Sequence, residues 1–175
     1  GTSYVNGSDI VVTKFSADGS ALAASTFLGG SGNDGVNTGS VLKFNYADEF
    51  RGEVDLDDQG NVFVVSSTRS LDFPEVNPIQ TGGAATQYGS ITRFDPDLSD
   101  ITFSTKVGMS GFVSLNSMDI APDGSLFVVG GLTSTYQGLP GSLYPNYIGG
   151  TADGVILKIL PDLSGFDVIT HFGSS

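Results

Sequence analysis

Short runs of apolar residues, separated by turn residues, recur along the whole chain. Residues 10–15 (IVVTKF) and 62–66 (VFVVS) are typical of these runs, which are rich in β-branched and aromatic residues. Between successive runs lie Asp, Gly, Asn and Ser, which supply the turn chemistry of β-hairpins. No apolar period of 3.6 residues persists for ten positions. The pattern therefore predicts antiparallel strands joined into hairpins, with helices limited to short turns.

Two hairpin patterns alternate. The first covers residues 9–29 and returns from 90 to 108 and from 155 to 173, with Lys14, Arg93 and Lys158 in one column. The second covers residues 55–65 and returns at 119–129. Three copies of the first pattern therefore enclose two copies of the second, as expected of a repeat architecture.

The spacing of the copies locates an insertion. Lys14 and Arg93 lie 79 positions apart, whereas Arg93 and Lys158 lie 65 positions apart. The additional residues fall between Gly29 and Asp55, as the stretch from Val36 to Phe50. We interpret residues 1–175 as a single segment with repeat unit 1 at 7–80 (insertion 36–50), repeat unit 2 at 87–150 and half of repeat unit 3 at 151–175.

Repetition of a unit of four strands indicates an all-β fold of β-propeller blades, each a four-stranded antiparallel sheet. A β-sandwich is the alternative, although a sandwich gives no reason for whole units to repeat. Propellers close with about four to eight blades, so two and a half units predict part of a larger propeller. Further blades of a parent protein, partner subunits or an open assembly would complete it. The half-unit 151–175 is expected to leave an open sheet edge.

The same residues resemble a known repeat. Residues 9–15, 18–20, 25–34, 60–65 and 72–74 are similar to the SBBP-type propeller repeat of bacterial and archaeal proteins. The resemblance covers most of the chain and is weaker in the second unit, where Met109 replaces Gly30. It implies a secreted or cell-surface protein, often beside adhesion modules. We expect a noncatalytic module that mediates protein or glycan contacts or assembly.

Composition excludes several classes of protein. The chain of 175 residues fits one medium domain. Its 7 basic and 19 acidic residues give a formal net charge of −12, which repels nucleic-acid phosphates, so no nucleic-acid partner is expected. No apolar run approaches the roughly 18 residues of a membrane span. The absence of cysteine removes disulfides, thiolate nucleophiles and cysteine-bound metals.

Carboxylate and amide side chains at two places are candidates for a metal site, namely Asp55, Asp57, Asp58, Asn33 and Asp34. The aspartates before Gly60 resemble the start of a calcium loop. Gln59 occupies the fifth position of that loop, however, and Ser66 stands where a bidentate glutamate is needed. Turn chemistry is therefore the main interpretation. No cofactor is expected, and calcium is the alternative.

Catalysis has little support in the residue pattern. His171 is the single histidine and lies in an expected strand, so a structural or surface role is favoured. A Ser–His–Asp arrangement stays open, because its members need only meet in space. The prediction is a protein without catalytic residues. The alternative is a fragment of a lyase or glycosidase propeller with its site in the central channel.

The insertion carries the candidate partner-binding residues. Leu42, Phe44, Tyr46 and Phe50 provide more apolar and aromatic surface than a solvated loop usually has. Alternation over residues 41–46 predicts an added strand with Leu42, Phe44 and Tyr46 on one face. Packing of this strand on its own blade is the alternative.

Overall fold

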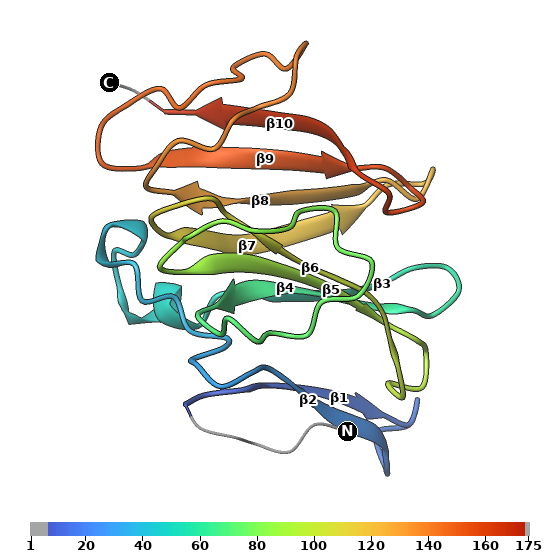
Figure 1. Cartoon of the computed structure of the whole chain (residues 1–175). Coiled ribbons are helices and arrows are strands. Elements are labelled where there is room, and N and C mark those ends of the chain that lie inside the picture. The colour runs from blue at the N-terminus through green and yellow to red at the C-terminus, as the bar shows by residue number, and fades with distance from the viewer. Residues whose placement is uncertain (1–6, 174–175) are drawn as a thin grey trace.

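The computed structural model describes residues 7–173, which form ten β-strands in three antiparallel sheets (Figure 1). The only helices of this part of the chain are two short 3₁₀ turns. The predicted all-β class is confirmed. Within the described residues, no helix has the length and apolar character needed to cross a membrane.

Each sheet is named by its place in the chain. The N-terminal sheet holds β1 (Ile10–Phe15) and β2 (Leu22–Leu28). The middle sheet has the order β3 (Glu53–Leu56), β4 (Val62–Thr68), β5 (Tyr88–Phe94), β6 (Ile101–Val107). The C-terminal sheet has the order β7 (Val113–Ile120), β8 (Leu126–Leu132), β9 (Asp153–Ile159), β10 (Phe166–Phe172).

The turns between paired strands form where the sequence predicts them. Gly60 has φ +82° and Gly124 has φ +85°, a conformation that costs glycine little. The Gly60 amide donates to the Asp57 carbonyl at 2.9 Å, and the Gly124 amide donates to the Ala121 carbonyl at 2.8 Å. The second hairpin pattern therefore folds in the same way in both of its copies.

The sheets are out of phase with the repeat units by one hairpin. Each four-stranded sheet joins the second hairpin of one unit to the first hairpin of the next, through β4–β5 or β8–β9. The expectation that the two hairpins of one unit share a sheet is wrong. Strand β4 is buried along its whole length and pairs with β5 over seven residues, whereas the longer link from β2 to β3 leads into a different layer.

This phase also corrects the expected position of the half-sheet. Strands β9 and β10 are paired to β8, so the last half-unit completes a four-stranded sheet. The two-stranded sheet is instead the N-terminal hairpin, in which β1 pairs with β2 and with no other strand of the described chain.

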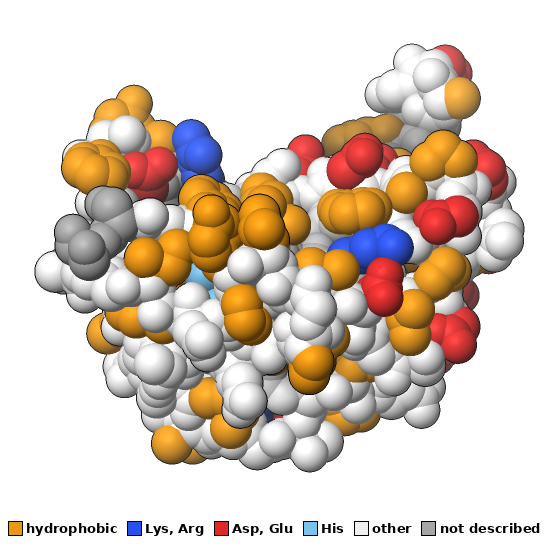
Figure 2. All heavy atoms as spheres, turned by 90° about the horizontal axis from the view of Figure 1, so that it is seen from above, with side chains coloured by type: hydrophobic (Ala, Val, Ile, Leu, Met, Phe, Trp, Pro, Cys, Tyr) orange, Lys and Arg blue, Asp and Glu red, His pale blue; other side chains and the backbone are white. Residues whose placement is uncertain are grey.

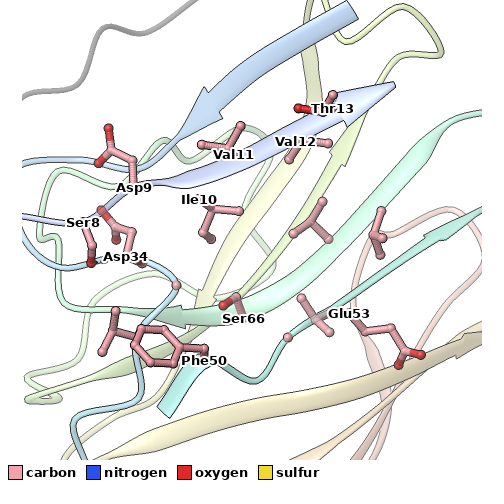
Figure 3. Close-up of a pocket in the computed structure, with 16 residues that line it drawn as sticks. Ser8, Asp9, Ile10, Val11, Val12, Thr13, Asp34, Phe50, Glu53 and Ser66 are labelled. Carbon is pink, nitrogen blue, oxygen red and sulfur yellow. Dashed lines mark hydrogen bonds between the residues drawn. The ribbon is translucent and has the colours of Figure 1, made fainter. Parts of the chain in front are cut away.

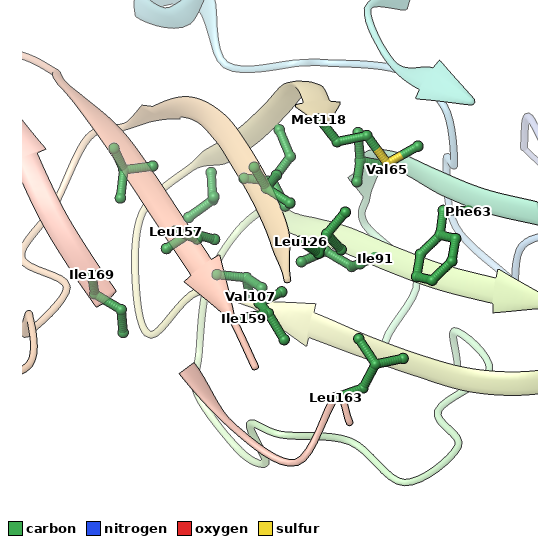
Figure 4. Close-up of a cluster of buried hydrophobic side chains, with 14 of the residues drawn as sticks. Phe63, Val65, Ile91, Val107, Met118, Leu126, Leu157, Ile159, Leu163 and Ile169 are labelled. Carbon is green, nitrogen blue, oxygen red and sulfur yellow. The ribbon is translucent and has the colours of Figure 1, made fainter. Parts of the chain in front are cut away.

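Two clusters of buried side chains hold the three sheets together. The larger lies between the middle and C-terminal sheets and includes Phe63, Met118 and Leu157 (Figure 4). The smaller joins the N-terminal sheet to the middle sheet, with Val12 from β1 packed in the same cluster as Val64 and Phe94. Apolar burial of this kind is the main favourable term in folding.

Candidate interaction surfaces

The insertion does not form the predicted strand. It forms two 3₁₀ turns, η1 (Ser40–Leu42) and η2 (Tyr46–Phe50). The Asn45 side chain accepts from the Ala47 amide at 2.8 Å, and the Asp48 carboxylate accepts from the Phe44 amide at 2.8 Å and the Asn45 amide at 3.2 Å. These local bonds satisfy backbone groups that a strand would pair with a neighbouring strand. The 3₁₀ turn is therefore favoured over the predicted strand.

The turn separates the four predicted partner-binding residues. The side chains of Phe44, Tyr46 and Phe50 are exposed. Leu42 is half-buried and lies against Gly131 of β8. Leu42 therefore belongs to the packing of the insertion on the C-terminal sheet, which corrects its placement on a common face with the two aromatics.

Two residues with buried side-chain amides, Asn37 and Gln87, anchor the insertion. The Asn37 amide donates to the Glu49 carbonyl at 2.7 Å, and the Asn37 side chain donates to the Leu42 carbonyl at 3.2 Å. The Gln87 side chain donates to Asn37 Oδ1 at 3.0 Å and accepts from the Thr38 amide at 2.6 Å. Both are polar residues in loops with no repeating pattern, so no sequence signal distinguished them.

The carboxylate of Asp34 is buried and accepts hydrogen bonds from nearby loop and strand residues. It accepts from the Ser70 hydroxyl at 2.7 Å, from the Gly30 amide at 2.8 Å and from the Thr68 hydroxyl. The neighbouring Asn33 accepts from the Arg69 amide through its backbone carbonyl at 2.9 Å. Asp34 thus ties the first glycine-rich loop to the end of β4.

The other acidic candidates lie around a hairpin turn. Asp57 accepts from the Gln59 amide at 3.0 Å and from the Asn61 amide at 2.9 Å. Asp55 and Asp58 line, with Asp57, a cavity of about 580 Å³ that Asp123 also borders. In the part of the chain that the structure describes, no group of three or more His, Cys, Asp or Glu side chains could hold a metal ion.

His171 lies inside the C-terminal sheet. Its side chain is buried, and Nε2 lies 2.7 Å from the Tyr136 carbonyl oxygen. The rings of Tyr147 and His171 are arranged edge to face, with their centroids 6.4 Å apart. These contacts fix the loop of residues 133–150 against β10, which is a structural use of the histidine.

A groove of about 600 Å³ runs along β1 (Figure 3). Consecutive residues from Ser8 to Thr13 line one side, and Val54 of β3 and Val64 of β4 line the other. Phe50, at the end of the insertion, also lines it. The groove depends on the relative positions of two sheets, which the sequence patterns did not predict.

Both outer sheets expose positions that the middle sheet buries. Phe63 in β4 is 5% exposed, whereas Phe127, its counterpart in β8, is 37% exposed. Phe94 in β5 is 2% exposed, whereas Phe15, its counterpart in β1, is 61% exposed. The stack of sheets therefore ends in an apolar face on each side.

The region around β10 adds further apolar surface. Leu143, Tyr144 and Phe172 are exposed. Hydrophobic side chains form several patches on the face seen from above, with charged groups among them (Figure 2). Mixed surfaces of this kind are typical of protein contacts that are not obligate.

No family model, curated protein or solved structure matches this chain. The geometry of the three sheets and their exposed surfaces is therefore the basis for a functional proposal.

Proposed function

We propose that the chain is a segment of a β-propeller and serves as a noncatalytic module for protein contacts and assembly, in a secreted or cell-surface protein. In this proposal the middle and C-terminal sheets are complete blades, and the N-terminal sheet is half of one. The resemblance to the SBBP-type repeat supports the extracellular setting, and the stacked antiparallel sheets support the blades.

The pair of apolar end faces is the observation that carries the proposal. Phe15 and Phe127 occupy repeat positions that are buried by a neighbouring sheet wherever such a sheet is present. An end face of this kind is stabilised when another sheet covers it. Because the two faces differ, contact between copies would be head to tail, and such contacts form rings or open chains.

The insertion supports a second kind of contact. Phe44 and Tyr46 project from a turn whose backbone is held by its own hydrogen bonds and by Asn37. Aromatic side chains on a preorganised segment are favoured in protein interfaces, because little conformational entropy is lost on binding. A glycan partner would use the same aromatic rings together with Asn45.

Sedimentation velocity over a range of concentrations tests the assembly role. The chain is expected to form species larger than a monomer as its concentration rises. Phe15→Lys and Val129→Lys each place a charge on one end face and are expected to shift the distribution towards the monomer. Leu71→Lys, at an exposed leucine outside both faces, is the matched control. A chain that stays monomeric at every concentration would contradict the assembly role.

A further inference from the structure

Among the described residues, no strand lies along the outer edge of β1, whereas every equivalent strand has a neighbour there. Strands β5 and β9 are the counterparts of β1, and each pairs on both sides, β5 with β4 and β6, β9 with β8 and β10. Within residues 7–173, strand β1 pairs with β2 alone. An edge of this kind presents unpaired backbone amides and carbonyls, which favour the addition of a strand.

The equivalent strands also define which strand is missing. Val62 of β4 pairs with Phe94 of β5, and Leu126 of β8 pairs with Ile159 of β9. Phe94 and Ile159 are the counterparts of Phe15. In both complete sheets the added strand is the second strand of a second-pattern hairpin, in one register. A strand in that register on β1 would place its first apolar residue opposite Phe15.

The groove lies where that hairpin would sit. Consecutive residues of β1 line it, so the strand edge faces it as well as the side chains (Figure 3). Val54, on the opposite wall, is 58% exposed, whereas its counterpart Met118 in β7 is 7% exposed and packs in the same cluster as Phe63 and Val65 of the middle sheet. Val54 therefore lacks the cover that a second-pattern hairpin gives to Met118.

We propose that this groove binds a two-stranded β-hairpin of the second repeat pattern, which pairs with β1 and covers Val54. The occupant is a hairpin like residues 113–132. Its second strand, the counterpart of β8, pairs with β1, and its first strand, the counterpart of β7, lies on the side of that strand away from β1. The inference deepens the proposed function and rests on it, since the occupant is the other half of the N-terminal blade. Main-chain pairing gives affinity in such contacts, and side-chain pockets give specificity.

A double-mutant cycle in an extended chain tests the proposal. Residues 113–152 are duplicated and placed directly before Asp9, in place of residues 1–8. The second strand of the added hairpin can then pair with β1 as β8 pairs with β9. Hydrogen exchange of the β1 amides is expected to slow by at least about tenfold in the extended chain. Exchange of the β5 amides provides the internal reference.

Val54→Lys distinguishes binding in the groove from a general effect of the extension. In the original chain this variant should leave the melting temperature nearly unchanged, because Val54 is exposed. In the extended chain it should lower the melting temperature by several degrees and restore fast exchange in β1. Leu71→Lys is the control and should be neutral in both chains.

Three results would overturn the proposal. The first is an equal effect of Val54→Lys in both chains, and the second is a set of β1 amides that exchange as fast with the extension as without it. Slow exchange in the original chain that depends on its concentration would show that a second copy pairs with β1, and would also overturn it. Because this measurement does not require the end faces to associate, its failure and that of the assembly role are distinguishable.

Discussion

Two leucines in hairpin turns adopt a left-handed backbone conformation. Leu98 has φ +57° and Leu163 has φ +58°, and the first copy of the turn has Gly19 at this position with φ +70°. For a residue with a Cβ atom this conformation costs about 1–2 kcal/mol. Both leucine side chains are buried in the clusters between sheets, which offsets that cost.

Replacing Leu163 should therefore give an unusual order of stabilities. Leu163→Ala loses the buried side chain and keeps the backbone strain, so it should lower the free energy of unfolding by about 2–5 kcal/mol. Leu163→Gly loses the same side chain but removes the strain, and its loss should be smaller by about 1 kcal/mol. Urea unfolding measures both. An alanine variant more stable than the glycine variant would contradict the role assigned to the strain.

Asp9 introduces a pH dependence at the edge of the groove. Burial raises the pKa of its carboxyl, and the nearby charge of Asp34 raises it further. Its Oδ1 atom is buried without a hydrogen-bond partner. The folded state therefore favours protonated Asp9. The free energy of unfolding falls as the pH rises above the unfolded pKa near 3.8 and levels off above the raised folded pKa.

Asp9→Asn should accordingly raise the melting temperature at pH 7, and the difference from the original chain should shrink as the pH falls towards 3. Thermal unfolding across this range provides the measurement. Asp34→Asn is the matched comparison and should lower the melting temperature at pH 7, because the Asp34 carboxylate accepts from Ser70, Gly30 and Thr68. A destabilised Asp9→Asn variant would show that the ionised carboxylate is needed for folding.

At the scale of elements, the insertion shows how local hydrogen bonds override an alternating pattern. Residues 41–46 alternate as a strand does, but Asn45 and Asp48 form a reciprocal cap that closes a 3₁₀ turn. The exposure of the aromatics and the inward position of Leu42 follow from this turn and not from the alternation. The spacing of Asn45 and Asp48 is that of a capping box, so the turn has its own signal in the sequence.

The two sides of the insertion should respond differently to substitution. The double variant Phe44→Ser/Tyr46→Ser should change the free energy of unfolding by no more than about 0.5 kcal/mol, since both side chains are exposed. Leu42→Ser, in contrast, should lower the free energy of unfolding by about 1–2 kcal/mol, because the half-buried leucine side chain that packs against β8 is lost. Chemical unfolding measures both. A large loss in the double variant would mean that the aromatics pack within the protein.

At the scale of the whole molecule, Glu53 links two sheets. Its Oε2 atom accepts from the Ser117 hydroxyl and from the Met118 amide, each at 2.6 Å. These bonds join β3 of the middle sheet to β7 of the C-terminal sheet. Both bonds favour the ionised carboxylate and lower the pKa of Glu53 from its ordinary value. The bond from the Ser117 hydroxyl has the larger effect, and the bond from the Met118 amide has the smaller one.

Because the pKa of Glu53 is lower in the folded state, its contribution is complete above the unfolded value near 4.5 and is lost as the pH falls through the folded value. Glu53→Gln should lower the free energy of unfolding by about 1 kcal/mol at pH 7 and have little effect near pH 3. Urea unfolding at the two pH values tests this. An equal loss at both pH values would show that packing, and not charge, carries the link.

The sequence by itself determined the strands, the hairpin turns and their repetition. Strand pairs across a turn are close in the chain, so β-branched runs and turn residues are sufficient to specify them. For the insertion, the sequence left two possibilities, an exposed aromatic face or packing on its own blade, and the 3₁₀ turn decided between them residue by residue.

Only the tertiary structure decided how the hairpins combine. The pairing of β4 with β5, the half-sheet at β1–β2 and the groove beside Val54 depend on which hairpin meets which across connections of 19 or more residues. Both phases of the repeat give the same hydrophobic pattern along the chain. The choice between them is made by burial on both faces of β4 and by the packing of one sheet on the next, which are properties of the assembled sheets.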